Sequence, residues 1–168
     1  MKEKVLKIIV AGEPGSGKSV ISQVHDACIS LRPMGVSIGL KTIPDEEESC
    51  RMTFTTWILT EGRPKDTTYL KGTRAAIIVS DLTKIKTVKK MKAWARSIRK
   101  GVGDIPLVFV GNNVDDANGN EVDLMIKIAK SFDSPVVLTR LGDRTSIEEV
   151  FAQVVKAVRN QSKGGEIV

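Results

Sequence analysis

Apolar and polar residues alternate in blocks along the chain, and these blocks predict strands that alternate with helices. Compact apolar runs of strand length cover residues 5–11, 75–80, 105–111 and 135–139. Apolar residues at helical spacing predict helices over 18–29, 83–100, 121–132 and from Ser146 onward, where Ser146 and Glu149 form a capping box. Strands that alternate with helices build a mainly parallel sheet covered on both faces. The pattern therefore predicts an α/β fold.

One part of the chain departs from this alternation. Residues 37–43 and 50–59 are both rich in β-forming residues, and Pro44 with the acidic run 45–48 separates them. Two strands joined in this way predict a hairpin, which makes the sheet mixed. The acidic run fits a solvated turn better than a binding role. Residues 60–72 are expected to form a loop with at most a short helix.

Length and composition agree with a single domain over 1–168 that ends in a polar tail, residues 160–168. No apolar run reaches the roughly 20 residues that span a bilayer, and we expect neither a secretory signal nor a lipid anchor. The two cysteines lack a metal-ligand spacing, so we expect reduced thiols and a cytoplasmic protein. His25 is the single histidine, so no histidine-based metal site or triad is predicted, and a helix-surface position is expected.

Residues 12–19 read G-x-x-x-x-G-K-S between the first predicted strand and the first predicted helix, the context of a phosphate-binding loop. Its glycines allow successive N–H groups to turn toward an anion, and the helix N-terminus adds partial positive charge. Lys18 would neutralise the outer phosphates, and the Ser19 hydroxyl would bind Mg²⁺. The residues expected to hold the nucleotide phosphates are Glu13, Pro14, Gly15, Ser16, Gly17, Lys18, Ser19 and Val20.

A second motif, Asn112-Asn113-Val114-Asp115, indicates which base is bound. It follows a predicted buried strand, at the carboxyl edge where open α/β sheets bind ligands. The Asp115 carboxylate can accept from the ring N–H and the exocyclic amine of guanine, whereas adenine has no such pair of donors for it. The motif therefore predicts GTP and GDP as ligands, and it argues against an ATP-using phosphotransferase.

With these motifs in place, the chain resembles the Ras superfamily of small GTPases, and most closely its Rab-like members. The family's N-K-x-D motif reads Asn112-Asn113-Val114-Asp115 here, and residues 77–83 look like the Rab strand before the third helix. The resemblance implies a P-loop NTPase of Ras-like three-layer fold, with a mainly parallel six-stranded sheet and one antiparallel edge strand. It also implies a Mg²⁺-dependent GTP/GDP switch that meets regulator and effector proteins.

Further site residues follow from the same resemblance. Ser37 falls where the family has its switch I threonine, so it would be the second protein ligand of Mg²⁺ after Ser19. Arg140 and Leu141 take the place of the S-A-K motif, and the Leu141 N–H would contact the base. Asn113 replaces a lysine whose stem would pack on the base, which affects affinity more than specificity.

The resemblance implies a degenerate switch II. Gly62 keeps the glycine of D-x-x-G, but Leu59 replaces the aspartate and Arg63 replaces the catalytic glutamine. Lys18, Gly62 and Arg63 are the residues expected to take part in hydrolysis, which should be slow because a guanidinium cannot accept from the attacking water. Arg63 is either inert or an internal arginine finger. The alternative is a pseudo-GTPase, a binding or scaffold module with little or no hydrolysis.

The helix 84–100 is strongly basic, with no acid between Asp81 and Asp104. By helical spacing, one face carries Lys89, Lys92, Arg96 and Arg99. This face is either simply solvated or a docking surface for an acidic protein or an anionic membrane. DNA and other nucleic acids are not expected, because Trp94 is the helix's single aromatic residue.

Overall fold

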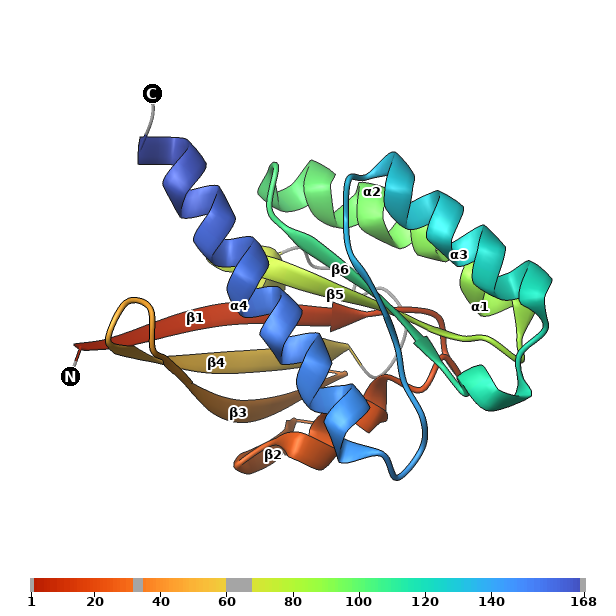
Figure 1. The fold of residues 1–168 in the computed structure, drawn as a ribbon, viewed down its shortest axis with the longest axis horizontal. Coiled ribbons are helices and arrows are strands. Elements are labelled where there is room, and N and C mark those ends of the chain that lie inside the picture. Colours follow the sequence, from red (N-terminus) through yellow and green to blue (C-terminus); the bar gives the residue numbers. More distant parts are fainter. Residues whose placement is uncertain (1, 32–34, 60–67, 167–168) are drawn as a thin grey trace.

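The computed structural model describes residues 2–31, 35–59 and 68–166, and a seven-stranded sheet forms its centre (Figure 1). The strand order is β2-β3-β4-β1-β5-β6-β7. The strands are β1 Lys2–Ala11, β2 Ala27–Leu31, β3 Val36–Asp45, β4 Cys50–Leu59, β5 Thr73–Asp81, β6 Leu107–Asn112 and β7 Val136–Leu138. The helical elements are η1 Lys18–Val24, η3 Thr68–Leu70, α1 Ile85–Lys89, α2 Met91–Val102, η4 Val114–Asp116, α3 Gly119–Ser131 and α4 Arg144–Glu166.

The predicted α/β fold with a mixed sheet is confirmed, but its strand count and edge differ from the prediction. Strands β4, β1, β5, β6 and β7 run parallel, while β3 pairs antiparallel with both β2 and β4. The described residues thus hold seven strands instead of six. The antiparallel strand β3 is not the edge strand, because β2 covers the Val36–Leu40 half of its outer side.

The extra strand comes from a region expected to be helical. The predicted helix over 18–29 is wrong beyond Val24, where η1 ends and His25 turns to extended backbone (φ −71°, ψ 142°). Ile21 and Val24 are the buried apolar residues of η1, and their spacing of three matches the three-residue turn of a 3₁₀ helix. Beyond His25 the chain pairs with β3 instead of continuing a helix, since the Asp26 N–H donates to Leu40 O at 2.8 Å.

His25 lies in the interior side of this corner and not on a helix surface. Its ring packs edge-on against Phe151 with centroids 6.1 Å apart. A Cβ built on Gly39 would lie 2.0 Å from the His25 ring, so the ring rests directly on the β3 backbone. Burial lowers the pKa of His25, the Lys41 charge lowers it further, and Asp26 acts in the opposite direction.

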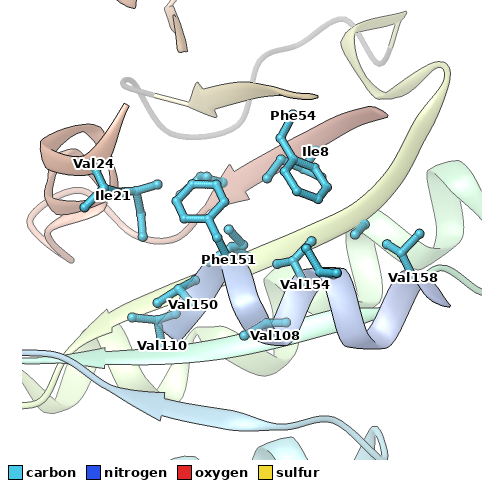
Figure 2. Close-up of a cluster of buried hydrophobic side chains, with 14 of the residues drawn as sticks. Ile8, Ile21, Val24, Phe54, Val108, Val110, Val150, Phe151, Val154 and Val158 are labelled. Atoms are coloured by element: carbon cyan, nitrogen blue, oxygen red, sulfur yellow. The ribbon is translucent and has the colours of Figure 1, made fainter. Parts of the chain in front are cut away.

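Alternation along β1 supplies both faces of the sheet with core residues. Ile8 and Val10 face α4 and η1, whereas Ile9 and Ala11 face the layer formed by α1, α2 and α3. Figure 2 shows the first of these cores, where Phe151 and Val154 of α4 lie against the sheet face that carries Ile8. The result is the three-layer arrangement visible in Figure 1.

The later helices begin and end somewhat differently from the sequence prediction. The helix expected over 83–100 divides at Lys90 into α1 and α2. The last helix begins at Arg144, and the Ser146 N–H donates to Asp143 Oδ1 at 3.3 Å, so Asp143 caps it in place of Ser146. The residues expected as a polar tail continue this helix as far as Glu166. No helix within the described ranges has the length and apolar character needed to cross a bilayer.

The acidic turn between β3 and β4 is tied down more firmly than a freely solvated turn. Asp45 is 2% exposed, and its Oδ1 lies 2.6 Å from Arg159 Nη2 of α4. Glu48 pairs with Lys4 of β1. The Asp45, Glu48 and Cys50 ligand atoms lie within 4.8 Å of one another. The Asp45 and Glu48 carboxylates each already pair with a cation. These ion pairs neutralise the charge of the cluster and attach the hairpin to α4 and β1.

Candidate functional site

The phosphate-binding loop leaves the carboxyl end of β1 and enters η1, as the sequence predicts. Gly12 lies so close to β5 that an added Cβ would meet Val79 O at 2.4 Å. Gly17 has φ 88°, and an added Cβ there would meet Asn112 Nδ2 at 2.5 Å. Side chains are therefore excluded at both positions, so the loop needs glycine to keep its course beneath the strand ends.

Lys18 lies at the centre of the loop as a buried cation. Its side chain is 8% exposed, and Nζ donates to Gly12 O at 2.8 Å and to Glu13 O at 3.1 Å. Burial lowers the pKa of Lys18, and the Glu13 carboxylate partly opposes that shift. Within the described part of the chain Lys18 makes no ion pair. An anion bound beside Nζ would therefore provide the negative counter-charge that no described ion pair gives to Lys18.

Two serines of the loop remain available for a ligand. Ser16 Oγ is fully buried and hydrogen-bonds to no described residue, which is costly unless a ligand or water bonds to it. Ser19, at the start of η1, is exposed. Pro14 and Gly15 are exposed at the tip of the loop, and Val20 N–H bonds to Gly17 O at 3.0 Å. The Ser16 hydroxyl is thus open to a phosphate chain and the Ser19 hydroxyl to a divalent cation, whereas the N–H groups of Ser16 and Val20 are already bonded within the loop.

Asn112 at the end of β6 joins three segments that are far apart in the sequence. Its Nδ2 donates to Ser16 O at 3.0 Å and to Gly17 O at 3.1 Å. Its Oδ1 accepts a hydrogen bond from the Thr139 hydroxyl. Asn112 is 3% exposed, so these bonds are shielded from water. The predicted base motif is thereby fastened to the phosphate loop, which places both motifs in one site.

The base-recognition residues lie at the rim of this site. Arg140 Nε donates to both carboxylate oxygens of Asp115, at 2.9 and 3.1 Å. Asn113 has φ 60°, and its side chain bonds to Asp81 and helps to lower the pKa of that carboxyl. The Leu141 side chain is 75% exposed, and no described residue accepts from its N–H. Asp115, Arg140 and Leu141 are thus brought together, while Asn113 turns away toward β5.

Asp81 itself is held by its neighbours at the end of β5. Burial acts to raise the pKa of Asp81, but hydrogen bonds from the Thr83 hydroxyl and N–H outweigh it, and the pKa is lowered. These bonds are 2.6 and 2.9 Å long. Asp81 therefore remains an anion that supports the neighbouring loops.

Of the predicted switch residues, the structure describes Ser37 and Leu59. Ser37 lies in β3, paired with Ser30 of β2 and Ile58 of β4. Since β3 is the second strand from β1, this places it roughly 10 Å to the side of β1. The Ser37 hydroxyl lies 3.5 Å from Cys28 Sγ, and its role as a metal ligand stays a prediction. Gly62 and Arg63 lie outside the described residues.

Leu59 occupies the position where the family carries an aspartate, and it is completely buried. It ends β4 and packs in the core that also contains Ile9, Ala11 and Val36. The side chain has no oxygen to offer a cation, in agreement with the interpretation of a degenerate switch II.

Three contributors to the site were not found by sequence reasoning. Trp94 of α2 donates from Nε1 to Glu13 Oε1 at 2.9 Å. Lys84 Nζ lies 3.4 Å from Gly15 O. Thr139 holds Asn112 from β7's carboxyl end. No motif marks the Glu13–Trp94 contact, because it joins residues 81 positions apart through the packing of α2 against the sheet.

Comparison with known proteins agrees with this geometry. Residues 61–160 match the Ras family, to which the chain belongs. Similar proteins include several Rab proteins. It is 31% identical to Ras-related protein Rab-31 of Rattus norvegicus, over 94% of this chain and 85% of that protein. It is 30% identical to Ras-related protein Rab-22A of Mus musculus, over 99% and 92% respectively, and 27% identical to Rab-1C of Dictyostelium discoideum, over 95% and 84%. The chain is a Rab-like small GTPase, as its motifs predict.

Proposed function

We propose that this chain is a slow GTP/GDP switch that uses Mg²⁺ in the cytoplasm and meets regulator and effector proteins through its nucleotide-dependent loops. The observation that carries the proposal is the Lys18 ammonium, which is buried against two neutral carbonyl oxygens. A cation so placed is poorly compensated by the protein and well suited to the outer phosphates of a nucleotide.

The remaining roles follow from the positions of the side chains. The loop N–H groups and Lys18 bind the phosphates, and Asp115 selects guanine by accepting from two ring-edge donors. Ser19, exposed at the start of η1, would hold Mg²⁺, which usually keeps several water ligands and needs few from the protein. The cation would neutralise charge on the phosphates. Asn112 keeps the base and phosphate subsites in register.

Slow hydrolysis is proposed from the two switch II substitutions. Leu59 is an apolar core residue where the family places an aspartate. Arg63 carries donors only, so it cannot orient an attacking water by accepting its proton. Without an aligned water, intrinsic turnover is expected on the order of minutes to hours, in the range of slow GTPases.

Equilibrium titration tests nucleotide binding directly. Labelled GDP, GTP and ATP are titrated into wild type and Lys18→Ala, each with and without Mg²⁺. We expect wild type to bind GDP and GTP but not ATP, and Lys18→Ala to lose binding while keeping a native circular dichroism spectrum. Matched affinity for ATP would overturn guanine selectivity, and unchanged binding by the folded variant would overturn the phosphate cradle.

Single-turnover hydrolysis separates the slow switch from its rivals. Wild type and Arg63→Gln are each preloaded with GTP, free nucleotide is removed, and hydrolysis of the bound GTP is followed with no partner present. An equal or faster glutamine variant means that Arg63 is inert, and a slower one means that it acts as an internal finger. Turnover of several per second by wild type would refute slow hydrolysis. Tight GTP binding without any turnover would assign the pseudo-GTPase alternative, which the buried Leu59 favours.

A further inference from the structure

The outer surface of α1 and α2 carries a row of exposed basic side chains. The buried side chains of these helices, among them Val88, Met91 and Ile98, pack on the sheet. The exposed ones form what we call the basic face: Lys86, Lys89, Lys90, Lys92, Arg96 and Lys100. In Figure 1 these helices lie on the opposite side of the sheet from α4, beside α3. The basic face is thus an outer surface of the described molecule.

The charge of the basic face is uncompensated. In the described part of the chain none of its six residues forms an ion pair. The nearest acids in sequence are occupied elsewhere, because Asp81 is bonded to Thr83 and Asp104 lies 3.6 Å from Arg99. The face therefore carries six positive charges with no carboxylate of its own.

The structure also corrects which residues share this face. Arg99, expected beside Arg96, turns inward: its Nη2 bonds to Ile105 O at 3.3 Å and its guanidinium lies over the Phe132 ring. Lys100 takes the outward position instead. Lys92, Arg96 and Lys100 follow at intervals of four along α2, so they form one stripe roughly 12 Å long, and Lys89 lies just before it at the end of α1.

The composition of the stripe indicates what it binds. Protein interfaces bury aromatic, Met and Arg anchors at their centre and are depleted in Lys. Here five of the six residues are Lys, and Trp94 is buried beneath them at 3% exposure. Ile85, 36% exposed, is the largest apolar side chain that these two helices leave open. A charged surface without a large exposed apolar side chain fits a partner that presents a diffuse layer of negative charge better than one that presents a shaped pocket.

We propose that the basic face docks on an anionic lipid surface. Lysine clusters of this size are attracted to acidic headgroups, and each residue near the surface contributes roughly a fivefold gain in partitioning. The attraction acts over about a Debye length, so it weakens as salt rises. This inference concerns α1 and α2 alone and does not depend on nucleotide hydrolysis.

Vesicle cosedimentation tests the proposal with the full chain. Vesicles of phosphatidylcholine alone and of phosphatidylcholine mixed with phosphatidylserine are compared from low salt to above physiological ionic strength. The test variant is Lys89→Gln/Lys92→Gln/Arg96→Gln. The matched control, Lys127→Gln/Lys130→Gln/Lys156→Gln, removes the same charge from exposed positions on α3 and α4. Circular dichroism and GDP binding confirm that both variants are folded.

We expect wild type and the control to bind the mixed vesicles in a salt-sensitive way, and the test variant to bind roughly 100-fold more weakly. Equal binding to neutral vesicles, equal loss in both variants, or no binding by wild type would overturn the proposal. If wild type ignores both vesicles but binds polyglutamate through these residues, the face serves an acidic protein and the lipid assignment is wrong.

Discussion

Arg140 and Asp115 form a paired rim at the base subsite, with Nε lying 2.9 Å from one carboxylate oxygen and 3.1 Å from the other. The same oxygens would accept from guanine. A carboxylate offers about four acceptor positions, so the arginine and the base compete for part of them. The pair is half exposed, and such pairs contribute roughly 0.2–1 kcal/mol.

Arg140→Ala is therefore expected to raise GDP affinity modestly, by up to about fivefold. The measurement is fluorescence titration with labelled GDP. Arg144→Ala is the matched control, because Arg144 is exposed nearby and its substitution removes the same charge. Weaker GDP binding in Arg140→Ala alone would mean that Arg140 orients Asp115 for the base instead of competing with it.

Changing Asp115 to Asn tests base selection. The amide has one acceptor oxygen and a donor nitrogen, so it no longer matches the two donors of guanine. We expect GDP binding to fall by at least about tenfold and xanthosine diphosphate, which presents an acceptor, to gain. Competition titration of both nucleotides against one labelled ligand gives the ratio. An unchanged ratio would show that Asp115 does not contact the base.

Leu59→Asp tests whether the missing aspartate can be restored. A carboxylate at this fully buried position loses the packing of leucine and is poorly solvated, so unfolding should become easier by more than about 2 kcal/mol. Mg²⁺ with GTP should recover part of the loss if the carboxylate reaches the cation. Urea unfolding is measured with and without both ligands.

Leu59→Ala is the control for that experiment, because it removes the packing but adds no oxygen. It should be destabilised without a Mg²⁺-specific recovery beyond that of wild type. The expectation fails if the aspartate variant is as stable as wild type in chelator, or if both variants respond to Mg²⁺ alike.

His25 predicts a stability change near neutral pH. Burial and the Lys41 charge lower its pKa in the folded chain, whereas an unfolded histidine titrates near 6.5. As pH falls below about 6.5, the unfolded chain gains a proton that the folded chain resists, so stability is complete above this pH and declines below it. Urea unfolding between pH 7.5 and 5.5 measures the slope. His25→Phe keeps an aromatic ring against Phe151 and should reduce the dependence of the unfolding free energy on pH. Equal slopes in both proteins would mean that His25 does not cause this dependence.

Much of the fold was predictable because its long strands and helices carry clear apolar patterns. β1, β5 and α2 follow the runs and spacings that predict them. The region after Val24 was not predictable in this way. Whether Ala27–Leu31 continues a helix or pairs with β3 depends on partners contributed by Val36–Leu40, which local spacing does not reveal.

The same distinction between local pattern and distant packing applies to the residues of the site. The two motifs identify Lys18, Asn112 and Asp115 because their chemistry depends on adjacent residues in the chain. The Arg140–Asp115 and Glu13–Trp94 bonds depend on how distant loops pack, so no spacing predicts them. The role of Ser37 was inferred from its interval to Ser19; the structure adds that Ser37 pairs with β2 and β4, and its role as a metal ligand stays a prediction.

The seventh strand also changes which backbone groups remain open to other chains. β3 and β4 are ten residues each; β4 is paired on both sides along almost its whole length, whereas β2 covers only the Val36–Leu40 half of β3. The outermost strands of the described sheet are β2, with five residues, and β7, with three. Short borders offer few unpaired N–H and C=O groups for strand addition. Edge-to-edge self-association through β7 is therefore disfavoured. A partner that adds a strand would find longer unpaired stretches in the described sheet along β2, along Lys41–Asp45 of β3 and along Lys2–Leu6 of β1.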